Sequence, residues 1–541
     1  MVLSAREGKK IVLKTLPFGI EQPYYKTYDY ILTEVAAKVQ QLFVEPTDLW
    51  KALWEAFDIS IVNRRFYDEI KQAFDFILLQ INKKGNPFKT DEDRAQFAIR
   101  LLGRIIFCWF LKRKNILKED ALSSKAVLNY KNKDYYHELL EPLFFEVMNK
   151  PEKERIGGLP KIIAHYPFLN GGLFDANKET DFYDADTSTP DFRLSIENDW
   201  FYNFFSITLE RYNFTVDENS SSNAEIAIDP EMLGRIFENL LAEQNPETGE
   251  SARKATGSFY TPREIVDYMV EQSITEYLKT ALGNTNDEPA LERNLFGVIP
   301  NQQLKLREAK PTDTKLNEAL EDFVHTSHLP DELKPQAQSI LDALNIIKVL
   351  DPACGSGAFP IGILQKLIAL KQEIVQVQNP KKQITQTAAY KLKLGTIQNS
   401  IYGVDIQPMA VELSRLRCWL SLVVDEENDN IKALPNLNFK FVCADSLVDV
   451  PDNEYVKIQS KKALEEFTNA TEQYFNPDYK QKTGLKVTIK RCLNEITNIH
   501  DVAINQIITQ LRKERNSASI SRLKQLEKSL QDYTKQQSVW H

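Results

Sequence analysis

One short string constrains this chain more than any other: Val-Leu-Asp-Pro-Ala-Cys-Gly-Ser-Gly-Ala-Phe, residues 349–359. The apolar residues just before it predict a buried parallel strand that ends at Asp351. Gly355 and Gly357 allow a sharp turn and a close approach of a ligand, because no Cβ stands in the way. The helix that follows directs N–H groups and the positive end of its dipole toward the turn. Strand, glycine turn and helix in this order predict a site for a small charged cofactor.

The glycine spacing excludes two common cofactor classes. A dinucleotide fingerprint needs a third glycine three residues after the second, but Pro360 stands there and Gly362 comes two positions late. NAD is therefore disfavoured. The Gly-Lys-Ser/Thr ending of an NTPase phosphate loop is also absent from the sequence.

The length of 541 residues exceeds what one compact core usually holds, so several domains are expected. Apolar residues at three- and four-residue steps in 66–74 and 101–111 predict helices, and 1–249 is expected to be a helical domain. Residues 250–450 form the middle region. Residues 451–541 are expected to be a basic helical insertion or arm.

The middle region alternates between strand and helix patterns. Strands are expected at 348–350, 401–404 and 439–442, with an amphipathic helix through 408–424. Such a series predicts a parallel, doubly wound sheet with its site at the carboxyl ends of the strands.

Charge and cysteine content bear on partners and location. The net charge is −9, yet lysine and arginine exceed the acids by seven from Lys480 to the end, which fits a DNA-facing element or an ordinary solvated helix face. The five cysteines have no paired spacing, which indicates a reducing cytoplasm and no metal site. No apolar run is long enough to span a membrane, so a soluble, cytoplasmic protein is expected.

Several strings together resemble those of a known family. Residues 351–359 resemble motif I of S-adenosylmethionine-dependent methyltransferases, in the form found in adenine-specific DNA methyltransferases. The string Phe-Tyr-Thr-Pro at 259–262 resembles motif X of the same enzymes, and the strand-end acids Asp405 and Asp445 resemble motifs II and III. Any single strand-end aspartate is otherwise an ordinary turn residue. Residues 168–174, 211–216 and 227–238 resemble the helical segment that precedes the methyltransferase core in type IIG restriction-modification enzymes and their phage-defence relatives.

This resemblance implies a fold, a cofactor and a partner. The fold would be α/β, with a Rossmann-like methyltransferase core that is incomplete at its C-terminal end and a large N-terminal all-α domain. S-adenosylmethionine would be the methyl donor and double-stranded DNA the substrate. The residues implied to bind the cofactor are Thr256, Phe259, Tyr260, Thr261, Asp351, Pro352, Ala353, Cys354, Gly355, Gly357, Phe359, Asp405, Ile406, Asp445 and Ser446.

The resemblance also assigns roles within that set. Asp351, Gly355 and Gly357 would hold the methionine moiety, with the motif X loop packed over it. Asp405 would accept hydrogen bonds from the ribose hydroxyls, and Asp445 with Ser446 would hold the adenine.

The catalytic motif of the family, Asn-Pro-Pro-Tyr, does not occur in this sequence. The nearest candidates are Asn476, Pro477 and Tyr479 in Asn-Pro-Asp-Tyr, which follows a polar helix pattern and can also be read as a helix stop. A truncated or split adenine-N6 methyltransferase is therefore expected, with a second chain supplying the catalytic and target-recognition parts. The alternative is a non-catalytic subunit that binds S-adenosylmethionine and completes or regulates a partner.

Overall fold

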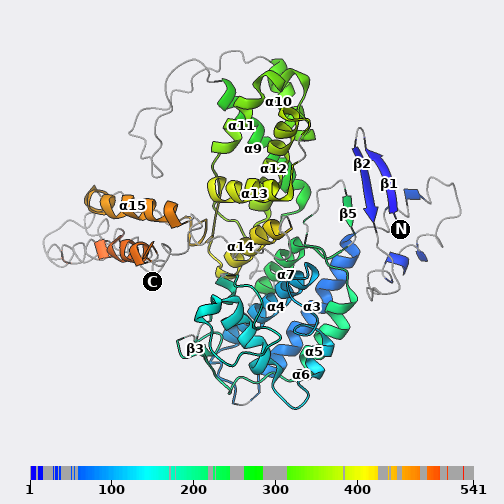
Figure 1. Cartoon of the computed structure of the whole chain (residues 1–541), viewed down its shortest axis with the longest axis vertical. Coiled ribbons are helices and arrows are strands. Elements are labelled where there is room, and N and C mark those ends of the chain that lie inside the picture. Colours follow the sequence, from blue (N-terminus) through cyan, green and yellow to red (C-terminus); the bar gives the residue numbers. More distant parts are fainter. Residues whose placement is uncertain are drawn as a thin grey trace.

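The computed structural model of the chain describes residues 2–7, 10–15, 59–83, 85–169, 172–216, 223–243, 261–283, 314–381, 384–424, 440–447, 454–474 and 484–496, apart from isolated positions inside these ranges, and a few scattered residues outside them. Helices α3 to α7 lie in the lower part of Figure 1 and helices α9 to α13 in the upper part, with α14 between the two groups.

The lower part is built around α4 (Asp91–Arg113), which packs against α3 (Ile59–Ile81) and α7 (Pro230–Glu243). Thr90 and Asp93 form a capping box at the start of α4. The helix predicted over 101–111 is confirmed, and all of its residues are buried, including Gly103 and Arg104. The remaining short elements here are α5 (Ser124–Leu128), the π-helical turns η1 (Tyr136–Leu140), η2 (Pro142–Met148) and η5 (Phe204–Thr208), the 3₁₀ turns η3 (Glu152–Glu154), η4 (Gly172–Phe174) and η6 (Leu209–Arg211), α6 (Asn198–Asn203), β3 (Tyr183–Asp184) and β4 (Thr189–Pro190).

The expectation of an all-α N-terminal domain is wrong. Strand β1 (Val2–Glu7) pairs antiparallel with β2 (Lys10–Thr15), and β2 pairs in parallel with β5 (Asn223–Glu225). The β-branched residues of β2 favour an extended backbone. This region is therefore mostly helical with a small three-stranded sheet.

The upper part holds the expected parallel strands. β6 (Val349–Asp351), β7 (Ile401–Asp405) and β8 (Phe441–Cys443) form one parallel sheet in the order β6-β7-β8. The first two strands match their predicted positions within a residue, and Phe439 of the third prediction lies outside the described residues. The other elements of this part are α9 (Arg263–Gly283), α10 (Thr314–Thr326), the 3₁₀ turn η7 (Asp331–Gln336), α11 (Ala337–Ile346), α12 (Ala358–Gln378), α13 (Gln386–Ser400) and α14 (Pro408–Val423), while α15 (Glu454–Tyr474) lies apart from them on the left of Figure 1.

The sheet has one covered face and one open face. Ile401 and Phe441 are buried on the side that helices α12, α13 and α14 contact. On the other side the described residues leave Leu350 61% exposed and Val442 39% exposed. Because successive side chains of a strand point to opposite faces, this difference follows the two-residue period of the strands.

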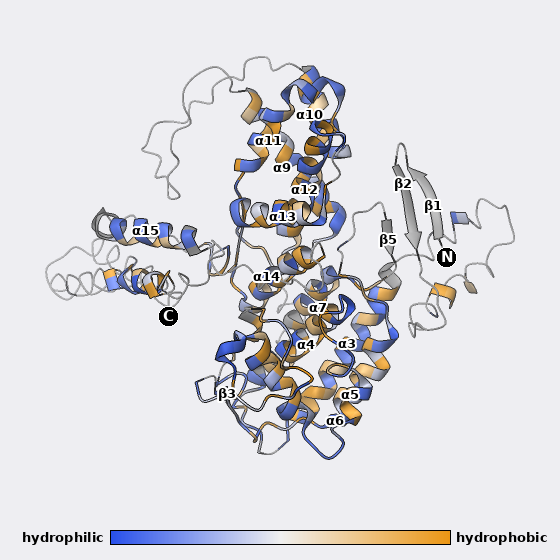
Figure 2. Ribbon diagram, in the orientation of Figure 1, coloured by the Kyte–Doolittle hydropathy of each residue, from blue (hydrophilic) through white to orange (hydrophobic). Residues whose placement is uncertain are grey.

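We call the lower helices α3 to α7, with the short elements between them, the helical body, and we call β6 to β8 with α9 to α14 the sheet region. The two share one continuous core. Trp419 of α14 is 1% exposed, and its ring centroid lies 5.5 Å from that of Phe107 in α4. The Lys114 ammonium donates to the Val424 carbonyl at 2.8 Å, which joins the ends of the same two helices. Figure 2 shows apolar residues running through α4, α7 and α14, where the two groups of helices meet.

Among the described residues, no helix is both long enough and apolar enough to cross a membrane. Of the predicted basic arm, α15 confirms a helix over 454–474, and described residues between 484 and 496 are also helical.

The contact between α14 and α4 yields a stability prediction. Trp419→Ala should lower the free energy of unfolding by about 3–5 kcal/mol, because a large ring is removed from the shared core. Phe76→Ala is the control, since Phe76 is 62% exposed on α3 and should change stability by less than about 1 kcal/mol. Urea denaturation followed by circular dichroism measures both. Equal effects of the two substitutions would contradict the shared core.

Candidate functional site at the carboxyl edge of the parallel sheet

The structure brings three of the predicted acids to one edge of the sheet. Asp351 ends β6 opposite Gly403, and Asp405 ends β7 opposite Cys443. Asp445 follows β8 by two residues, and the Asp405 carbonyl accepts from the Ala444 amide at 2.9 Å. The carboxyl ends of parallel strands are where such folds bind ligands.

The other predicted site residues fall into two groups. Thr256, Phe259 and Tyr260 of the motif X string, and the candidates Asn476, Pro477 and Tyr479, lie outside the described residues. Pro352, Ala353, Phe359, Ile406 and Ser446 are described and follow the ends of the strands closely in the sequence, whereas Thr261 is described just before α9. Ile406 is 59% exposed directly after the β7 acid, so an apolar side chain stands beside the carboxylates and in contact with solvent.

The turn formed by residues 353–357 uses all its amide groups inside the protein. The five N–H groups and their acceptors are Ala353 to Asp351 Oδ1 (3.1 Å), Cys354 to the Val404 carbonyl (2.9 Å), Gly355 to Asp405 Oδ2 (2.8 Å), Ser356 to Glu238 Oε1 (3.0 Å) and Gly357 to the Cys354 carbonyl (2.8 Å). Three of the five acceptors are carboxylates. The 353–357 turn therefore offers no N–H to an anion, unlike the phosphate-binding turns that also join a strand to a helix.

The glycines of the turn are required by its backbone. Gly355 has φ +52° and Gly357 has φ +90°, both in the region that favours glycine. A Cβ on Gly357 would lie 2.9 Å from Ser414 Oγ and 3.2 Å from the Ser414 Cα, so the turn also packs closely on α14.

Two side chains outside the motif strings also hold the turn by hydrogen bonds. Ser414 Oγ donates to the Gly355 carbonyl at 2.9 Å, and Arg417 Nη1 donates to the Ser356 carbonyl at 2.9 Å. Arg417 also makes a two-pronged ion pair with Glu218, with both N···O distances 2.8 Å. The sequence does contain a sign of this role, since a serine and an arginine interrupt the otherwise apolar face of the 408–424 helix. Buried polar groups need partners, so these two side chains predict hydrogen bonds to a neighbouring element.

The electrostatics of the edge favour a positively charged ligand. Burial, together with the nearby Asp405, raises the pKa of Asp351 above its ordinary value, while the Ala353 amide opposes this rise. Asp351 Oδ2 is buried and has no hydrogen-bond partner among the described residues. A buried carboxylate oxygen without a donor is costly, and a bound cation or donor would relieve that cost.

Cys354 is not a nucleophile here. Burial raises the pKa of its thiol to about 12, so the thiol is neutral at physiological pH. It serves instead as a packing residue, and a Cβ on Gly403 would approach its Sγ to 2.9 Å. No cluster of metal-ligating side chains occurs in the part of the chain that the structure describes.

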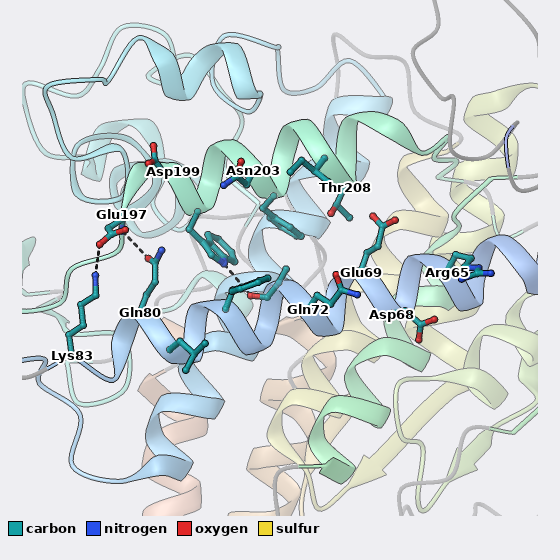
Figure 3. Close-up of a pocket in the computed structure, with 16 residues that line it drawn as sticks. Arg65, Asp68, Glu69, Gln72, Gln80, Lys83, Glu197, Asp199, Asn203 and Thr208 are labelled. Carbon is teal, nitrogen blue, oxygen red and sulfur yellow. Dashed lines mark hydrogen bonds and ion pairs between the residues drawn. The ribbon is translucent and has the colours of Figure 1, made fainter.

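A separate groove of about 840 Å³ runs between α3 and the α6–η5 segment. Figure 3 shows Lys83 and Glu197 at one end of it and Arg65, Asp68 and Glu69 at the other. Its lining includes four acids against two basic residues, so it is not a groove for a phosphate backbone. It lies away from the acids at the sheet edge and contributes no residue to them.

Comparison with known proteins agrees with this geometry. Residues 329–497, which include all three parallel strands and the 353–357 turn, match the family described as MmeI, DNA-methyltransferase domain. A relative from Methanocaldococcus jannaschii, named as a type II restriction enzyme and methyltransferase, is 32% identical over 376 residues. The resemblance to DNA methyltransferases of restriction-modification systems is confirmed.

Two further relatives carry methyltransferase names. DNA methyltransferase A of Bacillus subtilis is 20% identical over 404 residues, which are 73% of this chain. Adenine-specific methyltransferase PglX of Streptomyces coelicolor is 37% identical over 71 residues, which are 13% of this chain and 5% of that protein. The solved structure of the restriction-modification enzyme MmeI in complex with DNA aligns over 75% of this chain and 42% of its own, with 16% identity and a TM-score of 0.37.

The chain is much shorter than these relatives. The matched region covers 67% of this chain but 28% of the M. jannaschii protein, and 36% of the B. subtilis protein. The activities of the whole relatives are therefore properties of longer polypeptides.

The glycine geometry yields a prediction with a matched control. Gly357→Ala should lower the free energy of unfolding by about 1–3 kcal/mol, because alanine is strained at φ +90° and its Cβ contacts Ser414. Gly395→Ala in α13 meets no atom within 4 Å and should stabilise the chain by about 0.5–1 kcal/mol, since alanine favours a helix. Chemical denaturation of the two variants measures this difference in sign. Stabilisation by both would show that the turn does not need glycine.

Proposed function

We propose that the chain is the cofactor-binding part of an S-adenosylmethionine-dependent adenine-N6 DNA methyltransferase from a restriction-modification or phage-defence system. One observation carries the proposal: acids from three adjacent strand ends gather beside a turn whose own amides are all engaged. The family match over residues 329–497 supports methyl transfer to DNA as the reaction class.

The edge fits a cation that also carries hydroxyl and amino groups. S-adenosylmethionine carries a sulfonium, an ammonium and one carboxylate, so it has a net positive charge, and its ribose and adenine offer hydrogen-bond donors. Asp351 Oδ2 has a free acceptor for the ammonium. Asp405 accepts from Gly355 and from Gln407 at 2.8 Å each, and a carboxylate has further lone pairs for ribose hydroxyls. A triphosphate or a dinucleotide would instead meet like charges.

The remaining roles follow from position in the chain. Asp445 and Ser446, after the third strand, are proposed to hold the adenine. Thr256, Phe259, Tyr260 and Thr261, which precede α9, are proposed to cover the methionine end.

The bound donor would supply an activated methyl group. The chain then has to bind and orient the donor and to exclude competing ligands. A target adenine would have to leave the duplex to reach this edge. Adenine as the target is supported by the name of the S. coelicolor relative over its 71 matched residues. Asn476, Pro477 and Tyr479 stay predictions as its catalytic contacts.

We also propose that the parallel sheet belongs to a Rossmann-like core. Its three strands follow the crossover order of such folds, and one apolar face, with Leu350 and Val442, is left open by the described residues. Double-stranded DNA is the proposed partner, either of this chain alone or together with a second chain.

The first prediction on this site concerns the β7 acid. Asp405→Ala should weaken S-adenosylmethionine binding by about 1.5–3 kcal/mol, because charged hydrogen bonds to the ribose are lost. Isothermal titration calorimetry measures the dissociation constant. Asp342→Ala on the exposed surface of α11 is the matched control and should bind like the wild type. An affinity unchanged by Asp405→Ala would refute the assignment.

The second prediction concerns pH. Because the pKa of Asp351 is raised, this acid gains its proton at a higher pH than an ordinary aspartate, and affinity for a cationic ligand should fall earlier on acidification. Titrations with S-adenosylmethionine between pH 8 and 5, outside any range where the protein unfolds, would follow this fall. Asp351→Asn should bind more weakly at pH 8 and lose much of the pH dependence. If the affinity of Asp351→Asn fell with pH as steeply as that of the wild type, the pH dependence would come from another group.

Transfer of a tritiated methyl group to duplex DNA separates the enzyme from its alternative. Incorporation into adenine by this chain supports the proposed activity. Binding of the donor without transfer, restored by a second polypeptide, would favour a cofactor-binding subunit.

A further inference from the structure

Helix α7 of the helical body reaches the 353–357 turn directly. A Cβ on Gly234 would lie only 2.3 Å from Ser356 Oγ, so the glycine is what allows the helix to pack this close. Glu238 stands four residues later, on the same face of the helix. The turn of the sheet region is therefore in contact with an element from more than a hundred residues earlier in the chain.

Glu238 holds Ser356 by two hydrogen bonds. Its Oε1 accepts from the Ser356 amide at 3.0 Å and from the Ser356 hydroxyl at 2.6 Å. Ser356 is fully buried, and its carbonyl accepts from Arg417 Nη1 at 2.9 Å. The backbone of Ser356 is thus held at its N–H by a side chain from α7 and at its carbonyl by a side chain from α14.

The neighbouring amide is held in the same way from the sheet. Gly355 donates to Asp405, so two consecutive amides of the turn donate to carboxylates that come from different parts of the molecule. The flanking glycines add little rigidity of their own, since Gly355 and Gly357 have wide conformational freedom. The shape of the turn therefore depends on its acceptors.

We propose that Glu238 is a positioning residue for the cofactor site, through which the helical body sets the affinity for S-adenosylmethionine. This inference rests on the proposed function. Glu238 acts through Ser356 in this proposal, because its Oε1 accepts from both the amide and the hydroxyl of that residue. Without this acceptor the turn would adopt several conformations, and the apparent dissociation constant would rise in inverse proportion to the fraction that remains competent to bind.

The test compares two substitutions of Glu238. Glu238→Ala removes both hydrogen bonds and should raise the dissociation constant for S-adenosylmethionine about tenfold or more. Glu238→Gln keeps an Oε1 acceptor for Ser356 and should stay within about threefold of the wild type. Glu276→Gln and Glu276→Ala on α9 are matched controls, because that side chain is 67% exposed and pairs with Lys279.

Calorimetry separates positioning from a purely structural role. A positioning residue changes the dissociation constant at unchanged stoichiometry, whereas partial unfolding lowers the stoichiometry at unchanged affinity. Unchanged affinity in folded Glu238→Ala, or a loss of stoichiometry alone, would overturn the proposal.

Hydrogen–deuterium exchange without any ligand provides the second readout. The peptide that contains Ser356 should exchange faster in Glu238→Ala than in the wild type, and near the wild-type rate in Glu238→Gln. If the wild type failed to bind S-adenosylmethionine, the proposed function would fail, and the cofactor role of Glu238 with it. Exchange that is identical in all variants would instead show that the hydrogen bonds from Ser356 to Glu238 do not hold the turn.

Discussion

Hydrogen bonds from consecutive backbone amides to carboxylates are the interaction on which this site depends. The 353–357 turn bends sharply at two glycines with positive φ, and a turn of this kind leaves amides that must find acceptors. Here Asp351, Asp405 and Glu238 supply them. The use of carboxylates as acceptors also makes the site negatively charged, because the groups that accept from the backbone amides are anions.

This constraint links the two halves of the molecule. Asp405 belongs to the sheet, whereas Glu238 belongs to the helical body, and the Glu218–Arg417 ion pair adds a second connection between them. The aromatic contact between α4 and α14 continues that connection into the core. The helical body therefore contributes side chains that hold the turn of the site.

Patterns within a few residues predicted much of the sheet region. The features that they did not predict depend on contacts between residues far apart in the sequence. The strands at 349–351 and 401–405, their parallel order and the glycine turn follow from apolar runs and glycine positions within a few residues. The pairing of β2 with β5 was missed because β5 comes more than two hundred residues later. The role of Glu238 was missed for the same reason, since its partner Ser356 lies 118 residues away. The acids Asp351, Asp405 and Asp445 were predicted together because each one ends a strand or follows its end by two residues.

The central claim is that this anionic edge receives the amino-acid end of a sulfonium nucleoside. The most direct measurement is a crystal structure of the chain soaked with sinefungin, an analogue that carries an amine in place of the sulfonium. We expect density along the ends of β6, β7 and β8, with an amino group at Asp351, and a matching rise in melting temperature in solution. An edge without density, together with no change in melting temperature, would contradict the claim.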